Sequence, residues 1–568
     1  MIVKRSKYLI VFLLIIMVMT SVLSACGSKE TGDPKETKEV QSTTTATNTP
    51  DGNVNEVIDP LGKYDPPIEV RIGRINDDYK FLPGQTIDKN EVYDDYEKEL
   101  GVKLINEWVV PSSQYPAKSN VIISSGNIPD VFRVDGLQLR NLVEAGMIED
   151  LTEVYKKYAG EATKKIVTED GGYAINAATI DGKMYGFPET SQGFWTSNVL
   201  WLRQDWLEKL GLQPPKTMDE LIHIASEFVK NNPDGVQGTY GLGVSKELGQ
   251  LNGFFNGFHA YPFQWISDSN GKIVYGGIQP ETKAAVLKLA EMYKEGLIDK
   301  EFGVKDESKI NEAFVAGKLG MIYTHFAYPS VGGIMDLITN HPDAKLSAYP
   351  MPSADSEPAK AFVGPTAGMF WVVKKGFKHP EVVIKLANYY IKPDTRTDEE
   401  KEAHNKPYQE AGVSPWQYLI LAFSSPMTQI NEHRRVKAAM LANEQPDKSI
   451  MTNNEYGYLK GIYTYLKNPK ETNKQEIKTG WMYQGIVGTP NSGAEVLDYY
   501  FTNNLTITTP LKVASTPTMS QKMPTLTKME EVLYTKIILG EAGEADFDKF
   551  VADWKKQGGD EITKELNN

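Results

Sequence analysis

"VYDDYEKELGVKLINEWVV", residues 92–110, joins a predicted helix directly to a predicted strand. The helix covers 92–101 and ends at Gly101, a residue that closes helices because it adopts a left-handed backbone without strain. The strand covers 102–110. Another strand is predicted upstream, where apolar and polar residues alternate in "IEVRIG", residues 68–73. This strand–helix–strand order predicts an α/β fold.

The same alternation continues along the chain. Thr217 and Glu220 have the spacing of a capping box at the start of an amphipathic helix. Further helices are predicted at 280–295, which begins with a proline and is followed by a glycine, and at 379–390. Repeated alternation of strands and helices predicts α/β lobes with mostly parallel sheets.

The N-terminus has the pattern of an export signal. A basic start precedes the apolar run 8–22, which is short compared with the about 20 residues of a membrane-spanning helix. Small residues then lead to Cys26, the only cysteine of the chain. This pattern resembles a bacterial lipoprotein signal, which implies a signal peptide at 1–25 and lipidation at Cys26, with palmitate among the acyl chains. The alternative is a plain transmembrane anchor with an incidental cysteine.

Residues 26–59 are predicted to be a flexible tether that begins with the lipidated cysteine. The segment is rich in Lys, Glu, Thr and Asn, and "QSTTTATNTP" at 41–50 has no apolar period. Such a composition cannot bury enough apolar surface to offset the entropy of ordering the chain.

Composition excludes some classes of protein. The 568 residues carry a formal net charge of −13, which argues against nucleic acid as a partner because phosphate binding favours a basic surface. A single cysteine leaves no disulfide framework, so the fold must rest on hydrophobic cores. The chain is long enough for two or more such cores.

Motifs of catalysis and metal binding are absent from the sequence. It contains no phosphate-binding loop, HExxH, CxxC or Gly-x-Ser-x-Gly motif, and its seven histidines are not spaced as metal ligands. The segment 268–276 has a slight likeness to a calcium loop, but Asn270-Gly271 between short apolar runs predicts a hairpin turn instead. We therefore predict no catalytic residue, no metal site and no cofactor.

Five stretches carry motifs that occur together in one family: "SSGNIPDVFRVD" (124–135), "GKMYGFPE" (182–189), "LWLRQDWLEKLGLQPPKTMDEL" (200–221), "NEAFVAGKLGMIY" (311–323) and "ILGEAGEADFDKFVADWKKQGGDEI" (538–562). Their order and spacing resemble the family 1 extracellular solute-binding proteins, the lipoprotein receptors of carbohydrate ABC importers. The nearest type is that of the large oligosaccharide-binding lipoproteins of Gram-positive bacteria. The resemblance extends from about residue 60 to the C-terminus.

This resemblance implies a two-lobe, periplasmic-binding-protein-like fold of type II, with a hinge between the lobes. The stretch 392–445 matches the family poorly, and its polar part, 392–410, is expected to be an exposed insertion. The implied boundaries are 60–187 plus 321–373 for lobe 1 and 188–320 plus 374–568 for lobe 2.

The resemblance also implies the function. The protein would be lipid-anchored on the outer face of the cytoplasmic membrane, capture an oligosaccharide by hinge closure, and deliver it to the permease subunits of an ABC importer whose ATPase is separate. It would be a monomer without enzymatic activity. Two alternatives stay open: a surface glycan-degrading enzyme, and a peptide-binding or sensory receptor on the same fold.

A sugar ligand requires aromatic rings for its C–H patches and planar polar groups for its hydroxyls. The family places such groups at the ends of the first strands, at the interlobe crossings and on loops of lobe 2. The candidates at these places are Arg74, Asn76, Asp77, Arg133, Asp135, Glu189, Trp195, His259, Tyr261, Trp265, Tyr323, His325, Trp371 and Trp481.

Each candidate also has a structural interpretation, because tryptophans are more often packed than exposed and single carboxylates are usually solvated. Trp206 and Trp554 are assigned to the core, and Trp201 could be in either place. Trp195 and Trp265 are favoured as sugar platforms because their neighbours are glycine, polar and aromatic residues rather than a regular apolar pattern.

Overall fold

The structure is a computed structural model that describes residues 59–77, 79–191, 193–413, 415–511 and 516–567. The predicted signal peptide, Cys26 and nearly all of the predicted tether lie outside the described residues. Among the helices of the described ranges, none combines the length and the apolar character that crossing a bilayer requires.

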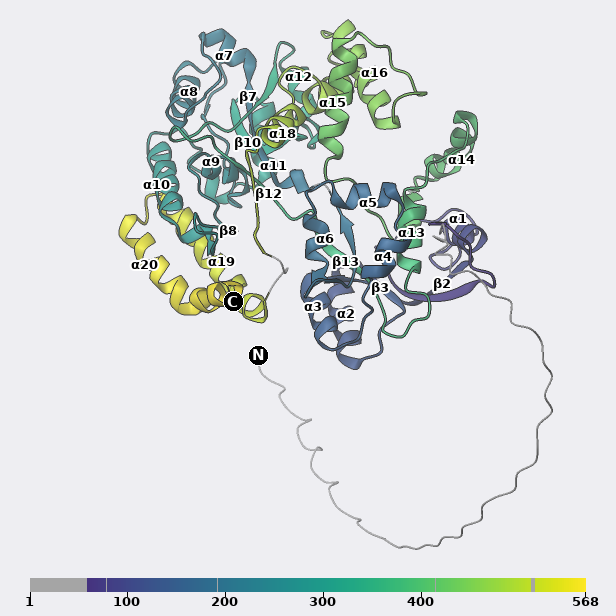
Figure 1. Ribbon diagram of the computed structural model, residues 1–568. Helices are drawn as coiled ribbons and strands as arrows, with labels where there is room; N and C mark the ends of the chain where they lie inside the picture. Colours follow the sequence, from purple (N-terminus) through teal and green to yellow (C-terminus); the bar gives the residue numbers. More distant parts are fainter. Residues whose placement is uncertain (1–58, 78, 192, 414, 512–515, 568) are drawn as a thin grey trace, which may run out of the picture. The chain divides into compact units, whose positions relative to one another are not determined.

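A five-stranded mixed sheet forms the centre of the first core (Figure 1). Its strand order is β2 (Val102–Val110), β1 (Ile68–Ile75), β3 (Val131–Asp135), β13 (Ala367–Val373) and β6 (Phe187–Thr190). β1 is parallel to β2 and β3, whereas β13 is antiparallel to β3 and β6. The buried cluster of this core spans residues 70–187, 367–387 and 420–423.

The helix predicted at 92–101 is present as α1 (Glu91–Asp95) and the π-helical turn η1 (Tyr96–Leu100). Gly101 ends it with φ +66°, and a Cβ there would lie 2.3 Å from the carbonyl oxygen of Tyr64. The prediction that glycine closes this helix is therefore confirmed, and glycine is required both by conformation and by space. The remaining helices of this core are α2 (Tyr115–Ser125), α3 (Gly136–Glu144), α4 (Thr152–Tyr158), α5 (Glu161–Thr168), α6 (Tyr173–Ala177) and α13 (Val382–Tyr390).

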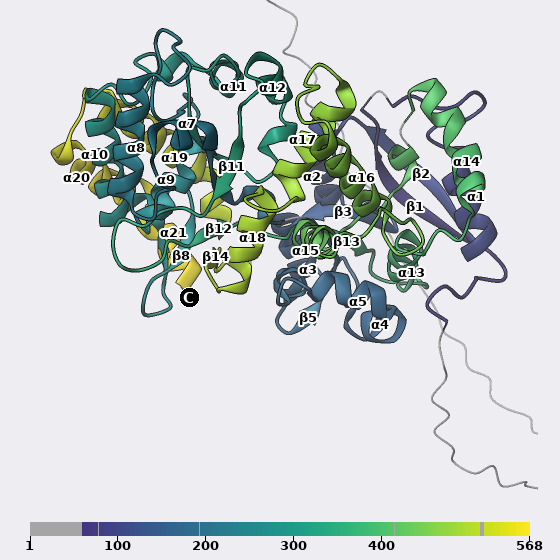
Figure 2. The ribbon, with the colours of Figure 1, turned by 90° about the horizontal axis from the view of Figure 1, so that it is seen from above.

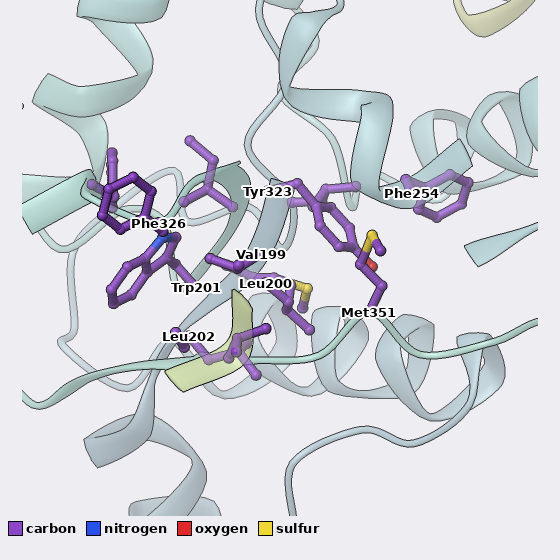
Figure 3. Close-up of a cluster of buried hydrophobic side chains, with 14 of the residues drawn as sticks. Val199, Leu200, Trp201, Leu202, Phe254, Tyr323, Phe326 and Met351 are labelled. Atoms are coloured by element: carbon purple, nitrogen blue, oxygen red, sulfur yellow. The ribbon is translucent and has the colours of Figure 1, made fainter. Parts of the chain in front are cut away.

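A three-stranded antiparallel sheet forms the centre of the second core. β7 (Asn198–Arg203) lies between β10 (Met321–His325) and β11 (Leu346–Tyr349). Figure 3 shows Val199, Leu200, Trp201 and Leu202 of β7 packed with Tyr323 of β10 and other apolar side chains. β7 is buried on both faces, which explains its continuous apolar sequence.

Helices surround this second sheet. The predicted capping box begins α8 (Met218–Asn231), where the Glu220 backbone N–H donates to Thr217 Oγ1 over 3.2 Å. The other helices are α7 (Gln204–Leu210), α9 (Asn252–Gly257), α10 (Pro280–Lys294), α11 (Glu307–Val315), α12 (Leu337–Asn340), α15 (Thr428–Leu441), α16 (Asn453–Lys467), α17 (Gln475–Val487) and α18 (Gly493–Thr502).

The C-terminal helices pack on a small hairpin. β8 (Trp265–Ser267) and β9 (Ile273–Tyr275) pair across the predicted Asn270-Gly271 turn, where Gly271 has φ +76°. The C-terminal helices are α19 (Pro517–Ile538), α20 (Glu544–Trp554) and α21 (Asp560–Asn567). Two more strand pairs are β4 (Thr179–Ile180) with β5 (Lys183–Met184) and β12 (Ala361–Val363) with β14 (Thr506–Thr508).

The α/β class is confirmed, but the sheets are mixed rather than mostly parallel. Among the described strands, only β1–β2, β1–β3 and β12–β14 are parallel pairs. The strand pairing also differs from the expected lobe boundaries. β10 and β11 pair with β7 in the second core, although 321–373 was expected in lobe 1, and α13 packs in the first core, although 374–568 was expected in lobe 2.

The polar insertion contains a helix, α14 (Asp398–Ala411), whose side chains are mostly exposed. Figures 1 and 2 both show α14 beside α1, and His404 Nε2 lies 3.1 Å from Glu91 Oε1. The chain then returns to the first core, where Ile420, Leu421 and Phe423 are buried. The poorly matching stretch 392–445 is therefore exposed in its polar part, as expected, and returns to the core beyond it.

Candidate functional site

A cavity of about 240 Å³ lies in the first core, where the central strands of the sheet end. It will be called the strand-end pocket. Its walls come from the end of β1, from β3, β6 and β13, and from the segment after α14. The lining residues are Gly73, Arg74, Ile75, Tyr79, Tyr115, Arg133, Glu189, Trp371, Gln417, Leu419, Ile420 and Ala422. Four of the predicted ligand-binding residues therefore lie together: Arg74, Arg133, Glu189 and Trp371.

Arg133, Glu189 and Trp371 form one polar cluster in this pocket. Arg133 pairs with Trp371 in the register of β3 and β13, so both side chains are on the same face of the sheet. Arg133 Nε and Nη2 donate to the two carboxylate oxygens of Glu189 over 2.6 and 2.9 Å. Trp371 Nε1 donates to the same carboxylate over 3.2 Å.

This cluster is fixed but still accessible. The side chains of Arg133 and Glu189 are 28% and 24% exposed, so a ligand can reach them. The bidentate geometry holds the guanidinium and the carboxylate in one plane, which is the arrangement that recognises vicinal hydroxyls or other planar polar groups. Trp371 is buried apart from its contribution to the cavity wall.

Two tyrosines complete the polar side of the pocket. The Tyr115 hydroxyl donates to the backbone carbonyl of Arg133 over 3.1 Å and accepts from its N–H over 3.2 Å. Burial raises the pKa of Tyr115, so the hydroxyl stays neutral. Tyr79 follows the end of β1, and its backbone N–H donates to Asn76 Oδ1 over 2.9 Å. Neither tyrosine was predicted as a ligand-binding residue, although both are aromatic residues next to strand ends.

The opposite wall is the segment 415–425, which will be called the insertion wall. Arg74 donates from Nη2 to the carbonyl of Gln417 over 2.5 Å and from Nη1 to the carbonyl of Leu419. Tyr418 is fully buried, stacks on Phe81 at 5.5 Å, and accepts from the backbone N–H of Leu82 over 3.2 Å.

The four lining residues of the insertion wall were not predicted from the sequence, because this stretch matches the family poorly. One local signal was present. "PWQYLILAF", residues 415–423, is an apolar and aromatic run that follows a strongly polar stretch. Such a run predicts that its side chains are buried, but it does not indicate which part of the protein they pack against.

Three other candidates near the strand ends have structural partners. The Asn76 side chain closes a turn by accepting from Tyr79, and Asp77 Oδ1 accepts from the backbone N–H of Ser112 over 2.6 Å. Asp135 is the N-cap of α3 and forms a capping box with Gln138. These side chains do not line the strand-end pocket.

Trp195 and His325 lie together at the start of the second core. Their ring centroids are 5.1 Å apart, and Trp195 also contacts Phe326 at 4.9 Å. Trp195 is 45% exposed, an unusual value for a tryptophan. Burial lowers the pKa of His325, so its ring is neutral at pH 7. The two rings form an aromatic surface apart from the strand-end pocket.

Four other candidates of the second core are packed in the protein interior. Tyr261, Trp265, Tyr323 and Trp481 are each 5% exposed or less. Trp265, which was predicted as a sugar platform, packs against Tyr275 and Trp554 and also lines a second cavity of about 220 Å³.

The predicted core tryptophans, Trp206 and Trp554, are buried as expected, and Trp201 is buried too. His259 is partly exposed and lies at the surface, where its Nε2 is 3.0 Å from Asp355 Oδ1. None of these four residues lines the strand-end pocket.

Comparison with known proteins gives the family. The family model described as "Bacterial extracellular solute-binding protein" matches residues 83–397. "Lipoprotein LipO" of Bacillus subtilis (strain 168) is 24% identical, over 85% of this chain and 89% of its own length. "Fructooligosaccharide ABC transporter substrate-binding protein FusA" of Streptococcus pneumoniae serotype 4 is 28% identical, over 50% of this chain and 51% of its own.

Solved structures support the same fold. An extracellular solute-binding protein from Bifidobacterium longum subsp. infantis superimposes with a TM-score of 0.57 at 15% identity, and the match covers 89% of this chain and 98% of the other. The protein thus has a periplasmic-binding-protein-like fold, and it belongs to the bacterial extracellular solute-binding proteins.

Proposed function

We propose that this protein captures an oligosaccharide in the strand-end pocket and delivers it to the permease of an ABC importer. The observation that carries the proposal is the cluster of Arg133, Glu189 and Trp371, which places a planar ion pair beside an indole. The hydroxyls of a sugar bind to such an ion pair, and its C–H patches pack on the indole. The names of relatives such as FusA support a sugar as the ligand and an ABC importer as the partner.

The size of the pocket suggests how a glycan would bind. A cavity of about 240 Å³ is smaller than the about 300–1,000 Å³ of sites that enclose a complete drug-sized ligand. The pocket would therefore hold one sugar unit, and the rest of the oligosaccharide would extend toward the second core. Trp195, beside the connection between the cores, is the aromatic side chain that would meet it there.

The remaining parts of the proposal concern location and mode of action. Cys26 would carry the lipid, and 26–59 would tether the folded body to the outer face of the membrane. The two cores would act as the two lobes and close on the ligand by hinge motion, with the protein a monomer. A separate subunit would supply the ATPase.

A glycan-degrading enzyme is the main alternative. Glycosidases use a pair of carboxylates on either side of the bond they cleave. Among the described residues that line the strand-end pocket, Glu189 is the only carboxylate, and it is paired with Arg133. This arrangement favours binding without turnover.

Isothermal titration of the chain from residue 27 onward against a panel of neutral and acidic oligosaccharides tests the proposal. We expect binding without hydrolysis, and Glu189→Gln should weaken it by about ten- to hundredfold, the size of a charge-assisted hydrogen bond. Glu107→Gln is the matched control, because Glu107 also pairs with an arginine of the same sheet, Arg71, outside the pocket. Release of shorter sugars, or equal binding by the Glu189 variant, would contradict the proposal.

A further inference from the structure

We propose that the strand-end pocket binds the carboxylate of an acidic sugar, a uronic acid unit, in preference to a neutral sugar. This inference rests on the proposed function and names the class of its ligand. It comes from the balance of charges and hydrogen-bond donors around Arg74.

The charges of the described residues that line the pocket do not cancel. Arg74, Arg133 and Glu189 are the charged lining residues. Arg133 and Glu189 neutralise each other as a bidentate pair. Arg74 is only 7% exposed, and no carboxylate of the described residues forms an ion pair with it. The described part of the pocket therefore carries one uncompensated positive charge.

Both described hydrogen bonds of Arg74 go to neutral groups, the backbone carbonyls of Gln417 and Leu419. A guanidinium has five N–H groups, so three of them remain. Nε is buried and has no partner among the described residues. A buried charge is costly unless it is paired, and carbonyl oxygens satisfy its donors without neutralising it.

A ligand carboxylate would supply what this site lacks. It brings a full negative charge and two acceptor oxygens in a plane, which is the geometry that arginine recognises best. The surroundings strengthen the attraction, because Trp371, Leu419, Ile420 and Ala422 give the pocket apolar walls and a low local dielectric. A neutral sugar hydroxyl could accept one hydrogen bond but would leave the charge uncompensated.

The test compares ligands that differ in charge but hardly in shape. The probes are trigalacturonate and its methyl ester, and oligosaccharides ending in glucuronate or mannuronate with their glucose and mannose counterparts. Titration calorimetry gives the dissociation constant of each. We expect at least one acid to bind about tenfold or more tightly than its neutral counterpart, the effect of one charge-assisted contact.

Variants identify the group responsible. Arg74→Met should remove most of this preference, whereas Arg74→Lys, which keeps the charge, should retain part of it. Arg71→Met is the matched control, because Arg71 is on the same strand but 60% exposed and outside the pocket. Glu189→Gln should increase the ratio of acid to neutral affinity, because it removes the negative charge of the pocket. If Arg74→Met does not fold, the ratio of acid to neutral affinity of the wild type decides the question.

The outcomes separate the two proposals. If Arg74 only holds the insertion wall, its variants will weaken acid and neutral ligands alike and leave the ratio unchanged, which overturns the inference. Tight binding of a neutral oligosaccharide without binding of any acid also overturns it but leaves the proposed function intact. If neither class binds, both proposals fail.

Discussion

Glu530 is a carboxyl group buried completely in the second core. Its oxygens lie 2.6 Å from the Tyr275 hydroxyl, 2.9 Å from the Tyr534 hydroxyl and 3.2 Å from the backbone nitrogen of Phe263. The Tyr534 hydroxyl also lies 2.5 Å from the carbonyl oxygen of Gly277. One hydroxyl proton cannot serve both oxygens, so a proton on Glu530 would complete the network.

Burial raises the pKa of Glu530 from 4.5 to about 7. Because the folded state binds this proton more tightly than the unfolded state, the contribution to stability is complete below about pH 4.5 and is lost as the pH rises through 7. The shift corresponds to about 3 kcal/mol of unfolding free energy.

Glu530→Gln tests this pH dependence. From pH 5 to pH 7.5, we expect the thermal midpoint of the wild type to fall steadily relative to that of the variant. The reason is that only the wild type has a group at this site that loses a proton. The control is Glu531→Gln, which changes a partly exposed neighbour paired with Lys528. A difference that stays constant with pH would show that Glu530 ionises normally.

The insertion wall is the element that gives the strand-end pocket its shape. It is attached at both ends: Arg74 and the Tyr418–Phe81 stack hold its start, and Ser424 exchanges hydrogen bonds with Thr190 over 2.8 and 2.9 Å at its end. Between these attachments, Leu419, Ile420 and Ala422 face the cavity.

Tyr418→Ala should release the start of this wall. Loss of a fully buried aromatic side chain costs about 3–5 kcal/mol, and the pocket loses its apolar side. We therefore expect weaker ligand binding together with faster amide hydrogen exchange in 415–425. Tyr499→Ala is the control, because Tyr499 is 45% exposed on α18. Unchanged exchange in 415–425 would mean that the wall does not depend on Tyr418.

Local patterns predicted the elements well, because caps and stops act over a few residues. Gly101 and the Thr217–Glu220 capping box are examples. The polar half of the pocket was also predictable, since Arg133 and Glu189 follow from strand ends and motif position. The insertion wall was not, because its contact with Arg74 joins residues 345 positions apart. The packing of Trp265 was not predictable for a similar reason, since Trp554, which contacts its ring, belongs to a distant helix.

At the scale of the whole molecule, three connections join the two cores: 190–198, 363–367 and 423–427. The first connection is hydrogen-bonded to each of the other two. The Ser191 N–H donates to the Thr366 carbonyl over 2.7 Å, and Thr190 Oγ1 donates to the Ser424 carbonyl over 2.8 Å. A few terminal residues of strands held in this way are typical of a hinge that absorbs domain closure.

Ligand binding should therefore change the dimensions of the protein. We expect the radius of gyration from small-angle X-ray scattering to decrease when a saturating oligosaccharide is added to the chain from residue 27 onward. Trp195→Ala should reduce this decrease, because Trp195 belongs to the second core, which would close on the ligand. An unchanged radius at saturation would argue against closure and for a rigid receptor.

The strand-end pocket has two origins in the sequence. Arg133, Glu189 and Trp371 lie within the residues 83–397 that match the family, whereas the insertion wall lies beyond them. The polar cluster of the pocket and its insertion wall thus come from different parts of the sequence. Natural variation in some ten residues after α14 would change the ligand specificity of related receptors while their strands stay the same. Exchange of this segment alone therefore offers a route to biosensors for other glycans.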